Sequence, residues 1–311
     1  LIDAYYDTGT PISGTRLDSE RTQVIQQEQL NQLNTSLQSN GKIEKVNPKA
    51  EGFKYGPTYS SWHPSGKYIA FSTNEIQQFF HSAGQKAIEV SDLGADLMIY
   101  DVENHCSFTD SLVYGDTYME TFPAWSPNGK DLYFTRAQSY QKGMSLDSIR
   151  YDLCKVSFDS STEKLGAPEV LFQASAQSKS VSFPCISPDG KFLMFTLSDY
   201  GNFSIWHPES ELYLMNLNSN EIRPLVEVNS DDVDSYHTWS SNGHWFVFSS
   251  KRMDGLWARP YFASFNPETG ETGKPFLLPQ KDPLFYDNYT YTYNRPELIK
   301  EPVKNGKEFE R

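Results

Sequence analysis

The chain has 311 residues, which is enough for one large all-β domain or two smaller ones, and 14% of its residues are aromatic. Its formal net charge of −13 argues against nucleic acid as a partner, because no basic patch is present to neutralise phosphates. No apolar run approaches the ~20 residues that a bilayer-spanning helix needs. The three cysteines lack CxxC spacing, so we expect free thiols rather than a disulfide framework.

Residues 1–52 are predicted to hold two strands on either side of a polar insert. The segments 1–7 and 41–47 are the strand candidates, and we assign them to the outer part of a β-sheet whose inner strands are absent. Residues 15–40 are rich in glutamine and free of proline, and Leu30, Leu33 and Leu37 recur at helical spacing, which indicates a short surface helix. A linker without regular structure is the alternative for this insert.

One short phrase occurs four times in residues 53–280. Each copy ends an aromatic or β-branched segment on Trp or Ile, passes through a turn that contains Gly, and leads into an alternating apolar run such as Tyr68–Ser72. Three copies have Pro in the turn, and the fourth has Ser241 in its place. The copies are spaced by 63, 61 and 53 residues, and their first residues and glycines are Trp62 and Gly66, Trp125 and Gly129, Ile186 and Gly190, and Trp239 and Gly243.

Each repeat phrase predicts a β-hairpin, because proline presets φ, Asn or Asp tolerates a left-handed backbone and glycine supplies a positive φ. Two further alternating segments follow each hairpin, so each repeat supplies four antiparallel strands. Units of this kind bury their faces by stacking radially. The chain is therefore predicted to be an all-β propeller with four complete blades, at about 53–115, 116–175, 176–230 and 231–280. The tryptophans of the phrase are expected to be buried between blades.

In this interpretation the two strands in residues 1–52 are the outer strand pair of an earlier blade. Closed propellers usually place both terminal strands in one blade, which removes exposed sheet edges. The tail at 281–311 is rich in tyrosine and is predicted to be coil that packs on the propeller, so it offers no partner for that pair. We therefore predict that the chain is part of a six- or seven-bladed propeller.

The repeat phrase resembles that of TolB-type β-propellers, whose core is Trp-Ser-Pro-Asp-Gly-Lys followed by an apolar strand. The segments at 78–81, 198–207 and 230–237 are similar to a narrower group, the exported TolB-like proteins of anaerobic gut-type bacteria. The resemblance implies a propeller fold and export to the periplasm or the cell surface. It implies no chemistry, because the group has no defined activity to carry over.

The sequence has no GxSxG, HExxH, P-loop or GxGxxG pattern and no haem motif, so nucleotide, haem and serine-hydrolase chemistry find no support. The segments 74–95 and 137–149 are predicted to be inserts that project from one rim, where loops carry function. Packing between blades is an equal alternative for the aromatic side chains near the rim. The ligand-binding candidates are Phe79, Phe80, His81, Tyr200, Phe203, Trp206 and Tyr236.

The most polar cluster lies just before the fourth repeat phrase. Asp231, Asp234 and His237 are candidate ligands of a divalent cation at the mouth of the central channel, because carboxylates suit such a cation. The favoured alternative is an acidic loop that enters the inner strand, with His237 satisfied by packing. Structural ion pairs are expected for three charged residues that follow the second strands of their repeats: Arg136, Asp199 and Arg252.

Two functions of different classes remain open at this stage. The leading hypothesis is a non-catalytic interaction or scaffold module of the cell envelope, which binds a protein or a glycan-related ligand through the rim loops. It rests on the lack of a recognisable catalytic constellation in a fold that hosts many functions. The alternative is a metal-dependent enzyme, similar to polysaccharide lyases, that uses histidines at the central channel.

Overall fold

A computed structural model of the protein describes residues 53–80 and 88–298. The strands predicted at 1–7 and 41–47, the helix predicted within 15–40, His81 and the end of the tail at 299–311 lie outside the described residues. Within the described ranges, no helix is long and apolar enough to cross a membrane.

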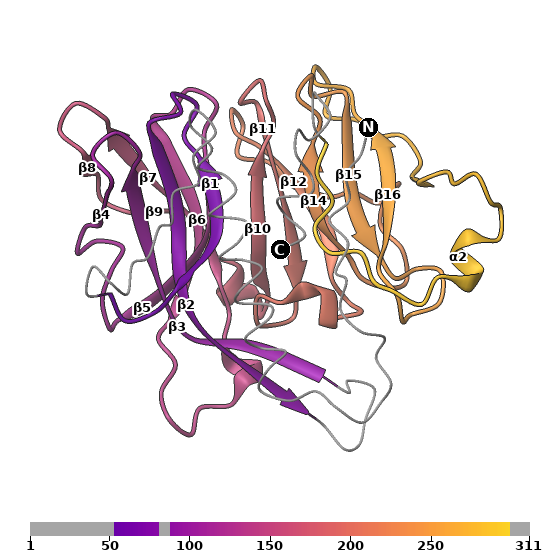
Figure 1. Ribbon diagram of the computed structural model, residues 1–311, viewed down its shortest axis with the longest axis horizontal. Coiled ribbons are helices and arrows are strands. Elements are labelled where there is room, and N and C mark those ends of the chain that lie inside the picture. Colours follow the sequence, from indigo (N-terminus) through magenta and orange to yellow (C-terminus); the bar gives the residue numbers. More distant parts are fainter. Residues whose placement is uncertain (1–52, 81–87, 299–311) are drawn as a thin grey trace. The chain divides into compact units, whose positions relative to one another are not determined.

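The described residues form four antiparallel sheets, one for each repeat (Figure 1). The strands of each sheet follow one another in chain order, so every blade is a simple meander. The first blade contains β1 (Pro57–Trp62), β2 (Tyr68–Phe80), β3 (Ile88–Asp101) and β4 (Cys106–Phe108), and the second contains β5 (Tyr118–Trp125), β6 (Asp131–Gln138), β7 (Asp152–Asp159) and β8 (Lys164–Leu165), with β9 (Glu169–Phe172) as an extra strand on β7.

The remaining blades have the same order. The third contains β10 (Ser180–Ile186), β11 (Phe192–Ser198), β12 (Glu211–Asn216) and β13 (Ile222–Pro224), and the fourth contains β14 (Asp234–Trp239), β15 (Trp245–Ser250), β16 (Arg259–Ser264) and β17 (Phe276–Leu277). The helical elements are one turn each: η2 (Leu146–Ser148), η3 (Ala174–Gln177), η4 (Ser204–Trp206) and α2 (Phe285–Asn288). The prediction of an all-β propeller protein with four complete blades is confirmed.

The turn of each repeat phrase explains its hairpin. The four glycines at these turns have φ between 69° and 74°, a left-handed conformation that only glycine adopts without cost. In the second blade the Ser126 hydroxyl donates to Asn128 Oδ1 (2.8 Å) and accepts from the backbone N–H of Asp131 (3.0 Å). These local bonds satisfy the polar groups of the turn and set the register of the strands that follow. The third and fourth hairpins repeat the arrangement with Ser187 and Ser240.

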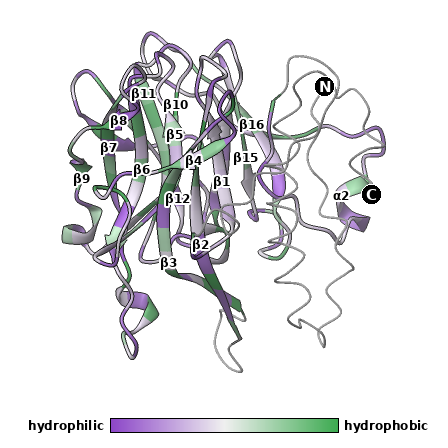
Figure 2. Ribbon diagram, turned by 60° about the vertical axis from the view of Figure 1, so that its left-hand side comes forward, coloured by the Kyte–Doolittle hydropathy of each residue, from purple (hydrophilic) through white to green (hydrophobic). Residues whose placement is uncertain are grey.

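The chain divides into two compact units, which are described separately. Of the described residues, the first unit holds 53–184 and 199–203, and so contains the first two blades. The second unit holds 185–198 and 204–298, which contain most of the third blade, the fourth blade and the tail. Figure 2 shows that the strands are largely apolar to neutral, whereas many of the connecting loops are hydrophilic.

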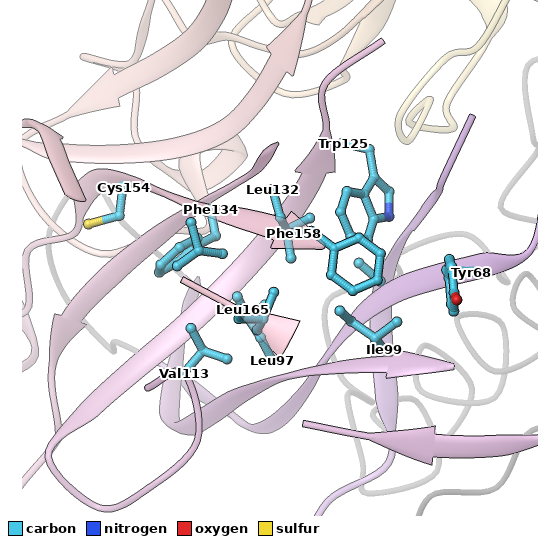
Figure 3. Close-up of a cluster of buried hydrophobic side chains, with 12 residues drawn as sticks. Tyr68, Leu97, Ile99, Val113, Trp125, Leu132, Phe134, Cys154, Phe158 and Leu165 are labelled. Atoms are coloured by element: carbon cyan, nitrogen blue, oxygen red, sulfur yellow. The ribbon is translucent and has the colours of Figure 1, made fainter. Parts of the chain in front are cut away.

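The core of the first unit lies between its two blades (Figure 3). Trp125 is 7% exposed and stands beside Phe158, with ring centroids 5.1 Å apart. Trp239 is 9% exposed in the corresponding core of the second unit, so both tryptophans are buried as predicted. The prediction is wrong for Trp62, which is 38% exposed. Trp62 belongs to the first blade, and the described residues include no preceding blade on which it packs.

His63 is also placed differently from its predicted position in a solvent-facing turn, because it is buried. Its Nδ1 accepts a hydrogen bond from the backbone N–H of Ser65 (3.1 Å), so its Nε2 carries the proton and donates to the Gly129 carbonyl oxygen (2.9 Å). The ring also packs edge-on against Trp125, with centroids 4.8 Å apart. A turn residue of one blade is therefore an interior residue of the interface with the next.

The segment at 74–95 is not the loop insert that the sequence predicted. Strands β2 and β3 continue through most of it as one antiparallel ribbon of 13 and 14 residues, which runs on past the rest of the blade (Figure 1). A β-bulge at Glu75 and Ile76 shifts the register in the middle of the ribbon. The register pairs Ile76 with Asp92, Gln77 with Ser91, Gln78 with Val90 and Phe79 with Glu89, so both faces of this part of the ribbon mix apolar and polar side chains.

The tail packs on the fourth blade within the second unit. Tyr286 and Tyr293 are 6% and 2% exposed, and they form a small tyrosine-rich core with Phe285 and Tyr289. Two blade hydroxyls hold the tail beyond this core. Ser249 donates to the Asn294 carbonyl oxygen and Thr238 donates to the Pro296 carbonyl oxygen, both at 2.7 Å.

Candidate functional site

The predicted ligand-binding aromatics do not form one exposed surface. Phe79 is half-buried in β2, and the side chain of Phe80, at the end of that strand, lies outside the described residues together with His81. Phe203 is buried and Tyr200 is half-buried, both in the first unit. Trp206, in the second unit, is half-buried. The Lys251 ammonium lies 4.5 Å from the centroid of the Trp206 ring and covers one face of that ring.

Two of the three predicted metal ligands have protein partners. Asp234 is fully buried, and its carboxylate binds the Arg252 guanidinium (2.5 Å) and the Ser230 hydroxyl (2.8 Å). His237 is buried with Nε2 3.1 Å from the Met194 carbonyl oxygen, whereas Asp231 is exposed. In the described part of the chain, no three His, Cys, Asp or Glu residues are grouped to hold a metal ion. The structural ion pair predicted for Arg252 is confirmed.

An aromatic residue lies three residues before each repeat phrase, and of the four only the half-buried Tyr236 was predicted as a ligand-binding residue: Tyr59, Phe122, Phe183 and Tyr236. In the first unit the ring of Phe122 lies 4.2 Å from that of Tyr59 and 4.1 Å from that of Phe183, measured between centroids. Phe122, Phe183 and Tyr236 have φ of 52–54°, which is unusual for bulky side chains. The strands bulge at Tyr59, Phe122 and Tyr236. The signal was the recurrence of an aromatic residue at one repeat position.

The first unit has a pocket of about 400 Å³ on the second blade. Strand β6 supplies Arg136 and Gln138, and strand β7 supplies Asp152 and Cys154. The β6–β7 connection passes over one side with η2, and the segment after β9 closes the other. These two segments add Met144, Ser148, Ile149, Arg150, Gln173 and Ser175 to the lining.

The two arginines are held differently. Arg136 Nε donates to Glu120 Oε1 (2.9 Å), Nη2 donates to the Leu112 carbonyl oxygen (2.7 Å), and the guanidinium lies 4.7 Å from the Tyr118 ring centroid. Arg150 is fixed only through Nε, which donates to the Asp199 carbonyl oxygen (3.2 Å). Both Nη atoms of Arg150 make no hydrogen bond with the described residues. They are therefore available donors for a ligand.

The acidic groups around the pocket are engaged by protein partners. Asp152 is the one carboxylate of the lining, and both of its oxygens already accept hydrogen bonds, from the Ser175 N–H (2.8 Å) and hydroxyl (3.0 Å). Glu120 lies behind Arg136, and burial raises its pKa to about 7, although the arginine opposes that shift. Burial also raises the pKa of the Cys154 thiol to about 12, so the thiol stays neutral at physiological pH.

Comparisons with known proteins show likeness of fold only. No family model matches the chain, and no curated protein sequence does. Among solved structures, an oligogalacturonate lyase in complex with manganese matches at 14% identity over 71% of this chain and 65% of its own, with a TM-score of 0.44. The β-propeller domain of the Trilobed protease from Pyrococcus furiosus matches at 12% identity, over 73% and 59%, with a TM-score of 0.37.

A luciferin-regenerating enzyme matches at 10% identity over 77% of this chain and 64% of its own, with a TM-score of 0.45. The chain thus spans slightly less than two thirds of the length of these three solved structures. None of these likenesses reaches a level that carries an activity over to this chain.

Proposed function

We propose that this propeller protein is a non-catalytic binding module whose second blade holds a carboxylate-bearing, glycan-derived ligand of one or two sugar residues. The observation that supports it is the presence of two arginines, Arg136 and Arg150, on one pocket of about 400 Å³ in a chain whose net charge is −13. The proposed setting is the cell envelope, in keeping with the resemblance to exported proteins.

The chemistry of the lining favours this ligand class. A guanidinium presents parallel N–H donors that match the two oxygens of a carboxylate, and Arg150 has both Nη atoms available for such a pair. The amides of Gln138 and Gln173 offer donors and acceptors of the kind that sugar hydroxyls need, and the Ser148 hydroxyl, which donates to the Ser145 carbonyl oxygen, can accept. The volume falls within the range of small-molecule sites, at its lower end.

The same lining argues for binding rather than catalysis. The carboxylate of Asp152 is engaged by Ser175, so it is poorly placed to act as a base. The Cys154 thiol has a pKa raised to about 12 by burial, so it is not a nucleophile near neutral pH. The lining contains no histidine. A pocket with fixed donors and no poised acid or base is suited to holding an anion unchanged.

Calorimetric titration tests the proposal with a hexuronic acid, its disaccharide, the matching neutral hexose and a short acidic peptide. We expect the uronic acids to bind and the neutral sugar not to bind. Arg150→Gln should weaken binding at least tenfold, which is about 1.4 kcal/mol. Lys155→Gln is the control, because it removes a positive charge from β7, the strand that begins two residues after Arg150, at a residue outside the pocket lining.

Four outcomes would overturn the proposal. The first is that no uronic acid binds. The second is that Arg150→Gln and Lys155→Gln weaken binding equally, which would mean that only general charge attraction is at work. The third is that the acidic peptide alone binds, which would assign the pocket to a protein partner. Turnover of a uronic acid disaccharide would likewise refute a non-catalytic role.

A further inference from the structure

A second polar site inside the first unit contains none of the residues that line the arginine pocket. Asp92, on β3 beside the bulge of the long ribbon, is 0% exposed. Its Oδ2 accepts hydrogen bonds from Asn74 Nδ2 (2.8 Å) and from Asn202 Nδ2. Behind Asn74 the cluster continues to the hydroxyls of Thr58 and Thr121. Strands from two blades and the segment at 199–203 therefore meet at one carboxylate.

The charge of this carboxylate has no counter-charge in the described part of the chain. The side chains that act on its ionisation are Asn202, Asn74 and Tyr151, all of them neutral. Burying a carboxylate without a positive partner costs far more than the hydrogen bonds of two amides return. Burial accordingly raises the pKa of Asp92 to about 7. Above that pH the cluster holds one uncompensated negative charge.

Buried oxygen atoms without hydrogen-bond partners accompany this charge. Asp92 Oδ1 and Asn202 Oδ1 accept no hydrogen bond of ordinary geometry, and the Tyr151 hydroxyl interacts with the Asp92 carboxylate without reaching such a geometry. Asn202 and Tyr151 are both buried, at 1% and 0% exposure. Buried polar atoms are satisfied in nearly all native proteins, so neighbouring orphans mark the place of a small bound species. These three oxygen atoms can all act as acceptors or metal ligands, which favours a bound cation.

We propose that Asp92 Oδ1, Asn202 Oδ1 and the Tyr151 hydroxyl bind one monovalent metal cation, sodium or potassium. One carboxylate supplies the single negative charge that such an ion balances, and the other two ligands are neutral oxygens. Calcium sites usually contain several carboxylates and magnesium demands a nearly regular octahedron, whereas this set has a single carboxylate. The cation would join the ribbon, the start of β7 and the segment at 199–203 within the first unit.

Thermal unfolding of the whole protein at about pH 8.5 tests this proposal, since Asp92 is then ionised. Sodium or potassium chloride replaces choline chloride at constant ionic strength, so that general screening stays fixed. We expect the midpoint to rise by about 2–4 °C towards 100 mM of the bound cation and to saturate, as for a ligand that binds only the folded state. Broadening of the sodium-23 NMR line reports binding directly if sodium is the ion.

Two variants and a control sharpen the test. Asp92→Asn should abolish the cation dependence, and Asp147→Asn, an exposed carboxylate on η2, should retain it. Asn202→Asp should place two carboxylates together, so that its midpoint is low without metal and rises with calcium. If neither sodium nor potassium changes the thermal midpoint of the wild-type protein, the proposal is overturned. The buried oxygens without hydrogen-bond partners would then be assigned to an internal water. This outcome is independent of ligand binding at the arginine pocket.

Discussion

The imidazole Nε2 of His63 lies 2.9 Å from the carbonyl oxygen of Gly129, 66 residues further along the chain. The two residues belong to the turns of consecutive repeat phrases, so the bond fastens the first blade to the second. The ring also lies where a side chain on residue 129 would be, because a Cβ built on Gly129 would collide with Nε2. Glycine is therefore needed at 129 for two reasons: the backbone φ is positive, and the His63 ring occupies the space of a Cβ.

Gly129→Ala is expected to destabilise the protein more than the same change at Gly66. Both glycines have a left-handed backbone, with φ of 71° and 73°, which costs an alanine about 1–2 kcal/mol. Gly66 has open space beyond its Cβ, whereas Gly129 faces His63, so crowding should add about 1–3 kcal/mol. Urea unfolding midpoints of the two variants measure the difference. Equal midpoints would show that the histidine simply moves aside.

Trp125→Ala should lower the free energy of unfolding by about 3–5 kcal/mol, because the side chain is 7% exposed and packs on His63 and Phe158. Trp62→Ala is the matched control, since Trp62 starts the first copy of the phrase but is 38% exposed. Trp62→Ala should lower the free energy of unfolding clearly less than Trp125→Ala does. Similar losses for both variants in chemical denaturation would contradict the interface described for the second blade.

Stability should depend on pH through Asp92 in a buffer without sodium or potassium. The folded carboxyl keeps its proton up to about pH 7, whereas the unfolded one loses it near 3.8. Between these values the folded state binds more protons, so the free energy of unfolding should fall as pH rises from about 4 to about 7, and then level off.

Asp92→Asn isolates this effect, because it removes the titrating group that faces Asn74, Asn202 and Tyr151. The variant should show a shallower fall in its urea midpoint over the same range. Some slope should remain, since burial also raises the pKa of Glu120 to about 7. A curve for the variant that runs parallel to that of the wild-type protein would mean that Asp92 ionises normally.

Tyr293→Ala should detach the tail from the fourth blade. Tyr293 is 2% exposed, and its backbone N–H donates to the Ala258 carbonyl oxygen (2.8 Å). Losing this ring removes the centre of the tyrosine-rich core, so limited proteolysis should cleave the tail at a much higher rate. Tyr291→Ala, which changes a ring that is 38% exposed, should leave the rate nearly unchanged. Equal protection in both variants would refute the role of Tyr293.

The sequence predicted the blades well because their determinants are local. A turn of Pro, Asn or Asp, and Gly sets each hairpin, and alternating apolar residues set which faces are buried. The prediction failed for the ribbon at 74–95, where glutamines between apolar residues were interpreted as a loop. It failed for Trp62 and His63 because burial at an interface depends on whether, and how, another blade covers it.

The candidate site was harder to predict for the same reason. Arg136 was expected in an ion pair, and its bond to Glu120 confirms that. Arg150 was not singled out, because 14 residues and a one-turn helix separate it from Arg136, and only the folded connection brings both to one pocket. Asp92 carried no sequence signal at all, since its isolation from positive charge arises from the packing of distant segments.

The interfaces between blades use a different bond in each unit. In the first unit a histidine ring reaches forward to the Gly129 carbonyl oxygen, and in the second the Trp239 indole N–H reaches back to the Cys185 carbonyl oxygen (3.0 Å). The blades thus share one fold but differ in the hydrogen bonds that join them to adjacent blades. Exchanging or duplicating a blade by protein engineering would join surfaces that lack matching donors and acceptors. The contacts between blades therefore specify the order of the blades.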